Sequence, residues 1–506
     1  MDYLMGIDVG TTGVKVLLID KNGNVVSKDT QEYPLYTPKP GWAEQNPEDW
    51  WNATVKGIKN VINNINPGDI KGIGLSGQMH GLVVLDCKFK VLRPSILWCD
   101  QRTVKQCEYI TKKVGYAKLM ELVCNPALTG FTAGKILWVR DNEPEIYKKI
   151  YKILLPKDYI RFKLTNVFAT EVSDASGMLL LDIRKRRWSE DILKILNLSK
   201  DLLPDCFESE DVTGVVTKEV SKITGLKEGT PVVGGGGDQA SSAIGCGIVE
   251  SGIISITIGT SGVVFAFSDE VKLDKLGRIH TFCHSVRNKW HTMGVMLSAG
   301  GSLKWFKDNL SKKEIEEAKK KKVDPYDIML KEVEKIKPGA ENLIFLPYLA
   351  GERTPHLDPY ARGVFFGLGI YHKKSHLIRS ILEGVSFGLR DSIEIMKILK
   401  IPIRQVRVTG GGARSLVWLQ ILADICNLEM VTVNVSEGAA FGVALLAGVG
   451  TRVYSDIKQV CRNVIKITNK IKPDLRNVKI YDEYYKMYKR MYLNLKKEFK
   501  MLSELK

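Results

Sequence analysis

One hairpin-like segment recurs at half the length of the chain, and this repeat constrains the fold more than any other feature. Residues 4–20 read LMGIDVGTTGVKVLLID, and residues 253–268 read IISITIGTSGVVFAFS. The turns 10–13 and 259–262 lie 249 residues apart in a chain of 506. Each copy has an apolar β-rich run, a turn of glycine and small hydroxyl residues, and a second β-rich run, which is the pattern of a β-hairpin.

The repeat predicts two related α/β domains that face each other, residues 1–246 and residues 247–506. Two Gly-Thr hairpins can also resemble each other by chance. The matched lengths of the flanking strands and the near-halving of the chain favour a true repeat. The lysine-rich stretch 482–506 is expected to form an exposed helical tail of the second domain.

Turns of this composition are suited to phosphate binding. Glycines let the backbone approach a ligand, backbone N–H groups point into the concavity, and threonine hydroxyls add donors. Neither turn contains the Walker A pattern. The first hairpin carries Asp8 and Lys15, where the second has Thr257 and Val264. This asymmetry predicts that only the first turn works beside a metal ion and the reacting phosphate.

A run of four glycines leads to a single aspartate just before the second hairpin. Residues 231–239 read PVVGGGGDQ, which places Asp238 where the two domains should meet. A carboxylate at such a mouth suits a base that accepts the proton of an alcohol attacking a phosphate. The alternative is a tight turn with a solvent-facing aspartate.

Three further segments carry polar residues at predicted strand ends. The glycines of TGGGARS (409–415) favour either a nucleotide at a helix N-terminus or close strand–helix packing. His80 in LSGQMHG (75–81) suits a hydrogen bond to a polyol, although a lone histidine is more often structural. Asp100 and Arg102 form either a surface ion pair or a polar clamp on a sugar.

The net charge of +17 suits anionic partners but does not identify one. The basic residues are spread along the whole chain, and they are not interleaved with aromatic residues as in a stacking platform for nucleic acid. A lysine-rich solvated surface is the simpler interpretation. We therefore expect no nucleic-acid partner.

Composition also bounds the cellular setting. The nine cysteines form no CxxC pair, which favours free thiols in a reducing compartment. No apolar run reaches the about 18 residues of a membrane span, and the N-terminal segment lacks the basic region of a secretory signal. We expect a cytoplasmic protein without membrane partners.

Together these segments resemble the FGGY family of carbohydrate kinases, from Gly6 to about Gly448. Two long stretches, 130–141 and 363–384, are similar to the signatures of the family. Four shorter segments resemble its xylulose-phosphorylating members in particular: SGQMHG (76–81), LLPKDYIR (154–161), FLPYLAGERTPH (345–356) and GGGARS (410–415). Similar glycerol kinases would carry an Arg-Glu pair in place of Met79 and His80.

The resemblance implies an α/β fold of two actin/hexokinase-like (ribonuclease H-like) domains with a nucleotide and sugar cleft between them. It implies ATP and Mg²⁺ as cofactors and phosphoryl transfer to the 5-hydroxyl of D-xylulose. Asp238 would be the general base and would also lie near the metal, and Asp8 would position Mg²⁺ through water. The remaining implied contacts are Gln78, Met79, His80, Asp100 and Arg102 for the ketopentose, Gly10, Thr11, Thr12, Lys15, Gly259 and Thr260 for the phosphates, and Gly410, Gly411, Gly412 and Ser415 for the adenosine.

Several alternatives remain open at this point. Cys99 and Gln239 depart from residues common in the family and could alter sugar preference, so a kinase for ribulose, gluconate or a deoxy sugar is the main alternative. An actin-like ATPase without sugar kinase activity and a basic nucleic-acid binder are less favoured. Dimers are the commonest homo-oligomers, so a homodimer is the default expectation.

Overall fold

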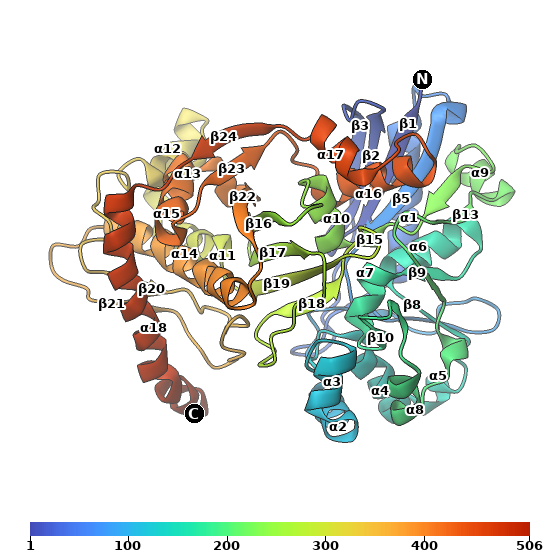
Figure 1. Cartoon of the computed structure of the whole chain (residues 1–506), viewed down its shortest axis with the longest axis horizontal. Coiled ribbons are helices and arrows are strands. Elements are labelled where there is room, and N and C mark those ends of the chain that lie inside the picture. Colours follow the sequence, from blue (N-terminus) through green and yellow to red (C-terminus); the bar gives the residue numbers. More distant parts are fainter. Residues whose placement is uncertain (506) are drawn as a thin grey trace.

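Each Gly-Thr hairpin lies inside its own seven-stranded mixed sheet (Figure 1). The structure is a computed structural model that describes residues 1–505. The first sheet has the strand order β13-β14-β5-β1-β2-β3, with β15 also paired to β5. Its strands are β1 (Tyr3–Val9), β2 (Gly13–Asp20), β3 (Val25–Glu32), β5 (Ile70–Gly77), β13 (Val212–Val215), β14 (Pro231–Val233) and β15 (Gly236–Gly237).

The second sheet has the order β18-β19-β17-β16-β22-β23-β24. Its strands are β16 (Gly252–Ile258), β17 (Gly262–Ser268), β18 (His280–Cys283), β19 (Trp290–Met296), β22 (Ile403–Thr409), β23 (Met430–Val433) and β24 (Ile467–Ile471). Short two-stranded pairings involve β4 (Glu44–Gln45), β6 (Val83–Leu85), β7 (Ser95–Ile96), β8 (Lys152–Leu154), β9 (Ala169–Glu171), β10 (Leu181–Asp182), β11 (Arg187–Trp188), β12 (Asp205–Phe207), β20 (Ile344–Leu346) and β21 (Val364–Phe366).

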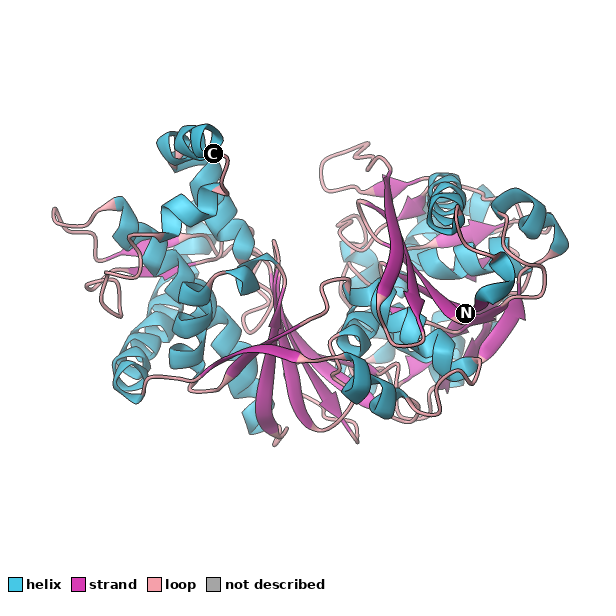
Figure 2. Ribbon diagram, turned by 90° about the horizontal axis from the view of Figure 1, so that it is seen from above, coloured by secondary structure: helices cyan, strands magenta, loops and turns pink. Residues whose placement is uncertain are grey.

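The strand pairings confirm the internal repeat. β1 pairs antiparallel with β2 and parallel with β5, and β16 pairs antiparallel with β17 and parallel with β22. The second turn is one residue tighter, because Val9 pairs with Val14 whereas Ile258 pairs with Gly262. Two related lobes therefore lie side by side, with the N-terminus in one and the C-terminus in the other (Figure 2).

Helices cover both sheets. They are α1 (Pro47–Ile62), α2 (Val104–Val114), α3 (Tyr116–Leu122), α4 (Thr132–Asn142), α5 (Pro144–Tyr147), α6 (Pro156–Thr165), α7 (Val172–Ala175), α8 (Glu190–Leu196), α9 (Lys218–Thr224), α10 (Asp238–Gly245), α11 (Gly300–Leu310), α12 (Lys312–Lys321), α13 (Pro325–Leu330), α14 (Lys374–Ile398), α15 (Leu416–Cys426), α16 (Gly438–Gly450), α17 (Ile457–Val464) and α18 (Leu475–Glu504). Within residues 1–505, none of these helices is long and apolar enough to cross a bilayer.

Local sequence explains why α1 begins where it does. The Asn46 side chain caps the helix by accepting the N–H of Glu48, and Pro47 occupies the first turn, where its missing N–H costs nothing. Trp50 and Trp51 lie on the buried face of the helix, which packs against β2 and β3.

Helix α16 belongs to the second half of the chain but packs on the first sheet, against β1 and β5 (Figure 1). Glycines make this approach possible. A Cβ at Gly6 would lie 1.9 Å from the carbonyl oxygen of Ala440, and a Cβ at Gly74 would lie 1.9 Å from that of Val443. The two lobes are therefore interlocked rather than joined by a single linker.

The expectation of an exposed C-terminal tail is wrong for one face of that segment. Residues 475–504 form the single helix α18, which packs on α15, α14 and β20 in the second lobe. Four tyrosines and two other apolar side chains along one face are buried: Tyr481, Tyr485, Tyr488, Met491, Tyr492 and Phe499. Their spacing of three and four residues makes the helix amphipathic, so the lysines occupy only its outer face.

Candidate active site

A cavity of about 280 Å³ brings residues of both lobes together. Three residues predicted from the sequence line it: Met79, His80 and Asp238. The other lining residues are Trp98, Leu128, Gly130, Phe131, Gln239, Ser261, Val263, His280, Phe282, Met293, Val295 and Arg353. The cavity is small, mostly apolar, and has a few polar groups that converge, which is the character of a site for a small polar ligand.

Asp238 is the first residue of α10 and follows the four-glycine loop. Its Oδ1 accepts the N–H of Gln239 at 2.8 Å. Burial, reinforced by the nearby carboxylate of Asp8, raises the pKa of Asp238 to about 7. A carboxyl group with this pKa changes its protonation state near neutral pH, as a general base requires.

The loop that carries Asp238 is held by buried hydrogen bonds. Arg161 donates to the carbonyl oxygens of Val233 at 2.6 Å and Gly234 at 2.5 Å. The N–H of Gly237 donates to Ser173 Oγ at 3.1 Å, and Ser173 in turn donates to a carboxylate oxygen of Glu171 at 2.9 Å. The backbone on the N-terminal side of Asp238 is thus fixed from two directions.

A fully buried charge cluster lies behind this loop. Lys157 contacts Asp158 at 2.6 Å, Asp174 at 3.4 Å and Glu171 at 3.6 Å. Burial disfavours the charge of Lys157, but the three carboxylates outweigh it and raise its pKa. The segment LLPKDYIR therefore supplies groups that support the loop of Asp238 rather than a surface helix.

Asp8 lies near the end of β1, opposite Lys15 on β2 and beside Ser76 on β5. Burial raises the pKa of Asp8, while Ser76 and Lys15 act in the opposite direction. Within residues 1–505, Asp8 Oδ1 is buried without a hydrogen-bond partner. A buried carboxylate oxygen of this kind is suited to a cation or to water bound by one.

Asp8 and Asp238 are suited to a Mg²⁺ ion whose other ligands are mainly phosphate oxygens and water. No cluster of three or more histidine, cysteine or acidic side chains in the described part of the chain could form a protein cage for a metal. Magnesium usually retains several waters and takes one or two carboxylates together with substrate phosphates. Asp8 and Asp238 match that modest contribution.

His80 is neutral and has a defined tautomer. Its Nδ1 lies 2.8 Å from the carbonyl oxygen of Gly177, an acceptor, so Nδ1 carries the proton and Nε2 is left as an acceptor. Burial lowers the pKa of His80 to about 3. The ring also packs edge-on against Phe131, at 4.8 Å between centroids.

Three of the predicted sugar contacts do not line the cavity. Gln78 instead accepts the Thr11 hydroxyl at 3.2 Å and so supports the first turn. Asp100 and Arg102 form a buried pair at 2.7 Å. Arg102 also lies over the Trp42 ring, 3.6 Å from its centroid, so both charges are already satisfied by protein groups.

The first turn has the predicted residues, but Lys15 is already paired with an acidic residue of the protein. Gly10 donates its N–H to Gly13 at 3.0 Å, which closes the turn, and Thr12 is exposed. Thr11 accepts the indole N–H of Trp98, which itself lines the cavity of about 280 Å³. Lys15 pairs with Glu437, just before α16, at 3.2 Å.

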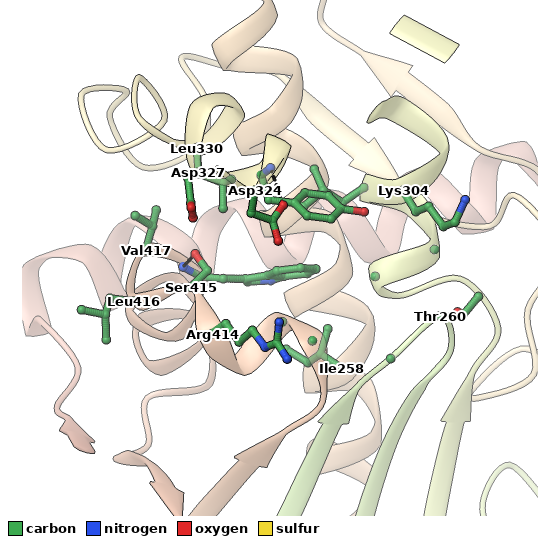
Figure 3. Close-up of a pocket in the computed structure, with 18 of the residues that line it drawn as sticks. Ile258, Thr260, Lys304, Asp324, Asp327, Leu330, Arg414, Ser415, Leu416 and Val417 are labelled. Atoms are coloured by element: carbon green, nitrogen blue, oxygen red, sulfur yellow. Dashed lines mark hydrogen bonds between the residues drawn. The ribbon is translucent and has the colours of Figure 1, made fainter. Parts of the chain in front are cut away.

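A larger cavity of about 650 Å³ lies in the second lobe (Figure 3). Five predicted residues line it: Gly259, Thr260, Gly411, Gly412 and Ser415. Gly410 does not. Its φ is +83°, and a Cβ there would lie 2.6 Å from the carbonyl oxygen of Ile258, so this glycine serves close strand packing.

Sequence reasoning missed one wall of this larger cavity, formed by residues between 300 and 334. Gly300 and Gly301 begin α11, and the N–H of Gly300 donates to the carbonyl oxygen of Gly259 at 2.8 Å. Asp324 and Asp327 lie across the cavity from Ser415 (Figure 3). The glycine pair after an apolar strand was a usable signal for α11, but nothing in the sequence placed residues 324–334 near 411–418.

The turn between β16 and β17 separates the two cavities. Gly259 and Thr260 line the larger one, and Ser261 lines the smaller one. Missed residues on the small side, His280, Phe282 and Arg353, come from β18 and from the GERTPH segment. The GERTPH segment was recognisable in the sequence, but the sequence did not show that Arg353 would line this cavity.

The lobes are related, each carries a Gly-Thr turn, and a carboxylate lines the smaller of two adjoining cavities. This arrangement defines a phosphotransferase that acts between a nucleotide and a small acceptor. The chain belongs to the FGGY family of carbohydrate kinases. Residues 3–245 match the N-terminal domain of that family, and residues 254–451 match its C-terminal domain.

Named relatives are similar over nearly the whole chain. The xylulose kinase of Bacillus subtilis (strain 168) is 41% identical over 498 residues, 98% of each chain. The xylulose kinase of Lactococcus lactis subsp. lactis (strain IL1403) is 39% identical over 499 residues, 98% of this chain and 97% of the relative. The crystal structure of ligand-bound xylulose kinase from Lactobacillus acidophilus superposes with a TM-score of 0.92 at 27% identity and covers 99% of this chain and 100% of that one.

Proposed function

We propose that the protein transfers the γ-phosphoryl group of MgATP to the 5-hydroxyl of D-xylulose, giving D-xylulose 5-phosphate and ADP. One observation carries the proposal: Asp238 lies in a small, mostly apolar cavity with a few polar groups, and a single turn separates this cavity from the larger one. The names of the relatives at 41% and 39% identity support xylulose as the acceptor.

In this proposal Asp238 is the general base. An alcohol is far more basic than a carboxylate, so Asp238 receives the proton late, as the new bond to phosphorus forms. Such assistance is typically worth about 10²–10⁴-fold in rate. The hydrogen bonds that Arg161 donates to the loop, and the one that Ser173 accepts from it, keep the carboxylate aligned with the hydroxyl.

The phosphates would lie between the two turns. The N–H groups and hydroxyls of residues 10–12, with Gly259 and Thr260, would bind them, and Asp8 would hold Mg²⁺ through water. When bound, Mg²⁺ would neutralise charge on the phosphates. Lys15 would reach the phosphates only by leaving Glu437, and Gly411, Gly412 and Ser415 would line the adenosine side.

The sugar would occupy the smaller cavity. His80 Nε2 would accept a sugar hydroxyl, because the other ring nitrogen is committed to Gly177. Met79 would provide an apolar wall. Asp100 and Arg102 act in this proposal as a buried pair that holds the segment 42–44, without touching the sugar themselves.

The test is ADP release with MgATP alone and with D-xylulose, D-ribulose, L-ribulose, gluconate or glycerol. Strong stimulation by D-xylulose alone is the expected result. Stimulation by another member of the panel would keep the roles of Asp238 and the two turns but reject the assignment of Met79 and His80. Release that no sugar stimulates would reject the kinase proposal in favour of an ATPase.

A further inference from the structure

We propose that helix α18 positions the sugar-side loop 351–358, through the hydroxyl groups of Tyr488 and Tyr492, so that Arg353 binds the sugar. This inference rests on the proposed sugar kinase activity. It gives a role to the C-terminal helix, which runs along the outer side of the second lobe (Figure 1).

Arg353 is a charged side chain at the sugar-side cavity with no protein partner of opposite charge. It lines the cavity with Asp238, His80 and His280. In the described part of the chain, its guanidinium makes no ion pair within 4.0 Å and no side-chain hydrogen bond. A guanidinium group has five N–H donors, so it can serve more than one sugar oxygen.

One side of the loop is fastened to the second sheet. The N–H of Thr354 donates to the carbonyl oxygen of Val295 at 3.0 Å, and the N–H of Val295 donates to Thr354 Oγ1 at 3.0 Å. Glu352 accepts the N–H of Leu297 at 3.1 Å. These bonds fix the residues on both sides of Arg353 along β19.

The other side of the loop is fastened to α18. The hydroxyl of Tyr492 donates to Asp358 at 2.9 Å, and its ring stacks on His356 with centroids 3.4 Å apart. The hydroxyl of Tyr348, which also lies 3.2 Å from His356, donates to that of Tyr488 at 2.8 Å.

Backbone bonds connect these two sides directly. Asp358 and Glu352 exchange N–H to carbonyl hydrogen bonds, both at 2.8 Å. A shift of Asp358 away from Tyr492 is therefore transmitted to Glu352 and to the adjacent Arg353. No residue of this loop lines the larger cavity of about 650 Å³, which would hold the nucleotide. Such a shift therefore changes sugar binding and leaves ATP binding unchanged.

The first experiment is steady-state kinetics of Tyr492→Phe with D-xylulose and with ATP. Loss of a hydrogen bond to a carboxylate changes an equilibrium constant by about tenfold. We expect the KM for the sugar to rise by about three- to tenfold, with kcat and the KM for ATP changed less than about twofold. Tyr488→Phe, which removes the bond to Tyr348, should act in the same direction if Tyr492→Phe folds poorly.

Tyr484→Phe is the matched control. Tyr484 is on the same helix, but its hydroxyl donates to Asn342 at 2.8 Å, away from the loop. This variant should keep the KM for the sugar of the unaltered protein. An equal increase in all three variants would mean a general effect of α18 on folding and would overturn the inference.

A double-mutant cycle with Arg353→Gln tests whether the tyrosine acts through Arg353. Arg353→Gln should raise the KM for the sugar, and adding Tyr492→Phe should then cause little further change. Additive effects, or an unchanged KM in either single variant, would overturn the inference while the unaltered enzyme remains an active kinase. If the unaltered protein phosphorylates no sugar, the proposed function fails first and the inference fails with it.

Discussion

At the scale of single residues, environment decides what each predicted side chain can do. Asp238 and Asp100 are acidic residues in glycine- or aromatic-rich segments, Asp100 fully buried and Asp238 partly buried at a cavity. Asp100 is neutralised by Arg102 at 2.7 Å, whereas Asp238 faces a cavity and a second carboxylate. Only Asp238 therefore keeps a free carboxylate near neutral pH for a proton transfer.

Replacement of Asp238, the proposed base, is the first prediction. Asp238→Asn should lower kcat by about 10²–10⁴-fold while sugar and ATP still bind, because the amide has the same shape but cannot accept the proton. Asp201→Asn, at an exposed site, is the control. Steady-state kinetics checks this, and turnover within tenfold of the unaltered enzyme would contradict it.

The pKa of Asp238 also gives the acid side of the pH profile. The base acts only when ionised, and its pKa is raised to about 7 in the free protein, mainly by burial. The value of kcat/KM for the sugar should therefore fall as pH is lowered through about 7, by up to about tenfold per pH unit. A profile that stays flat from pH 8 to pH 6 would be inconsistent with this role.

At the scale of elements, the hairpin of β18 and β19 carries an unusual set of buried histidines. His280 and His291 lie on its strands and His284 lies in its turn. Burial is the main cause that lowers the pKa of all three. His291 stacks on Phe265, and neither of its ring nitrogens has a hydrogen-bond partner within residues 1–505.

Because these histidines are buried in the neutral form, we predict that the folded protein loses stability in mild acid. The unfolded chain takes up protons below about pH 6.5, while the folded protein keeps the rings neutral, so the free energy of unfolding falls as pH drops. Each histidine contributes up to about 1.4 kcal/mol per pH unit. His291→Phe should retain the stability at pH 7.5 and reduce the loss between pH 6.5 and pH 5. Denaturant unfolding at these pH values measures the free energy of unfolding. If this energy depends on pH equally in His291→Phe and in the unaltered protein, the prediction is wrong.

Helix α18 shows how a pattern can be misread at this scale. Its lysine content predicted an exposed tail, but the tyrosines at 481, 485, 488 and 492 form one continuous face. Tyrosine combines a large apolar ring with a hydroxyl that needs a partner when buried. The spacing of the tyrosines is that of an amphipathic helix, which the expectation of an exposed tail overlooked. The packed structure supplied their partners Asp358, Asp391 and Glu383.

At the scale of the whole molecule, the two lobes share one structural helix. α16 leaves the second lobe, packs on the first sheet and contacts α10. Gly442 makes the last contact possible, because a Cβ there would lie 1.9 Å from the carbonyl oxygen of Ser241. Unfolding of either lobe should therefore disturb the other.

Gly442→Ala should lower the free energy of unfolding of the whole protein by at least about 1–3 kcal/mol, because backbone atoms block the new methyl group. Gly411→Ala is the control for stability, since a Cβ there meets nothing within 4 Å. Denaturant unfolding of both variants tests the difference. A loss confined to a separate transition of one lobe would contradict the interlocked arrangement.

The sequence alone determined the two-lobed α/β fold, the two Gly-Thr turns and the candidate base. These features are encoded locally, in strand–turn–strand patterns and in short motifs whose backbone geometry depends on adjacent residues. The tertiary structure decided the rest: the pairing of Lys15 with Glu437, the use of Asp100 and Arg102 as an internal pair, and the placement of Arg353. Those outcomes depend on burial and on contacts between residues far apart in the chain, which local sequence patterns do not specify.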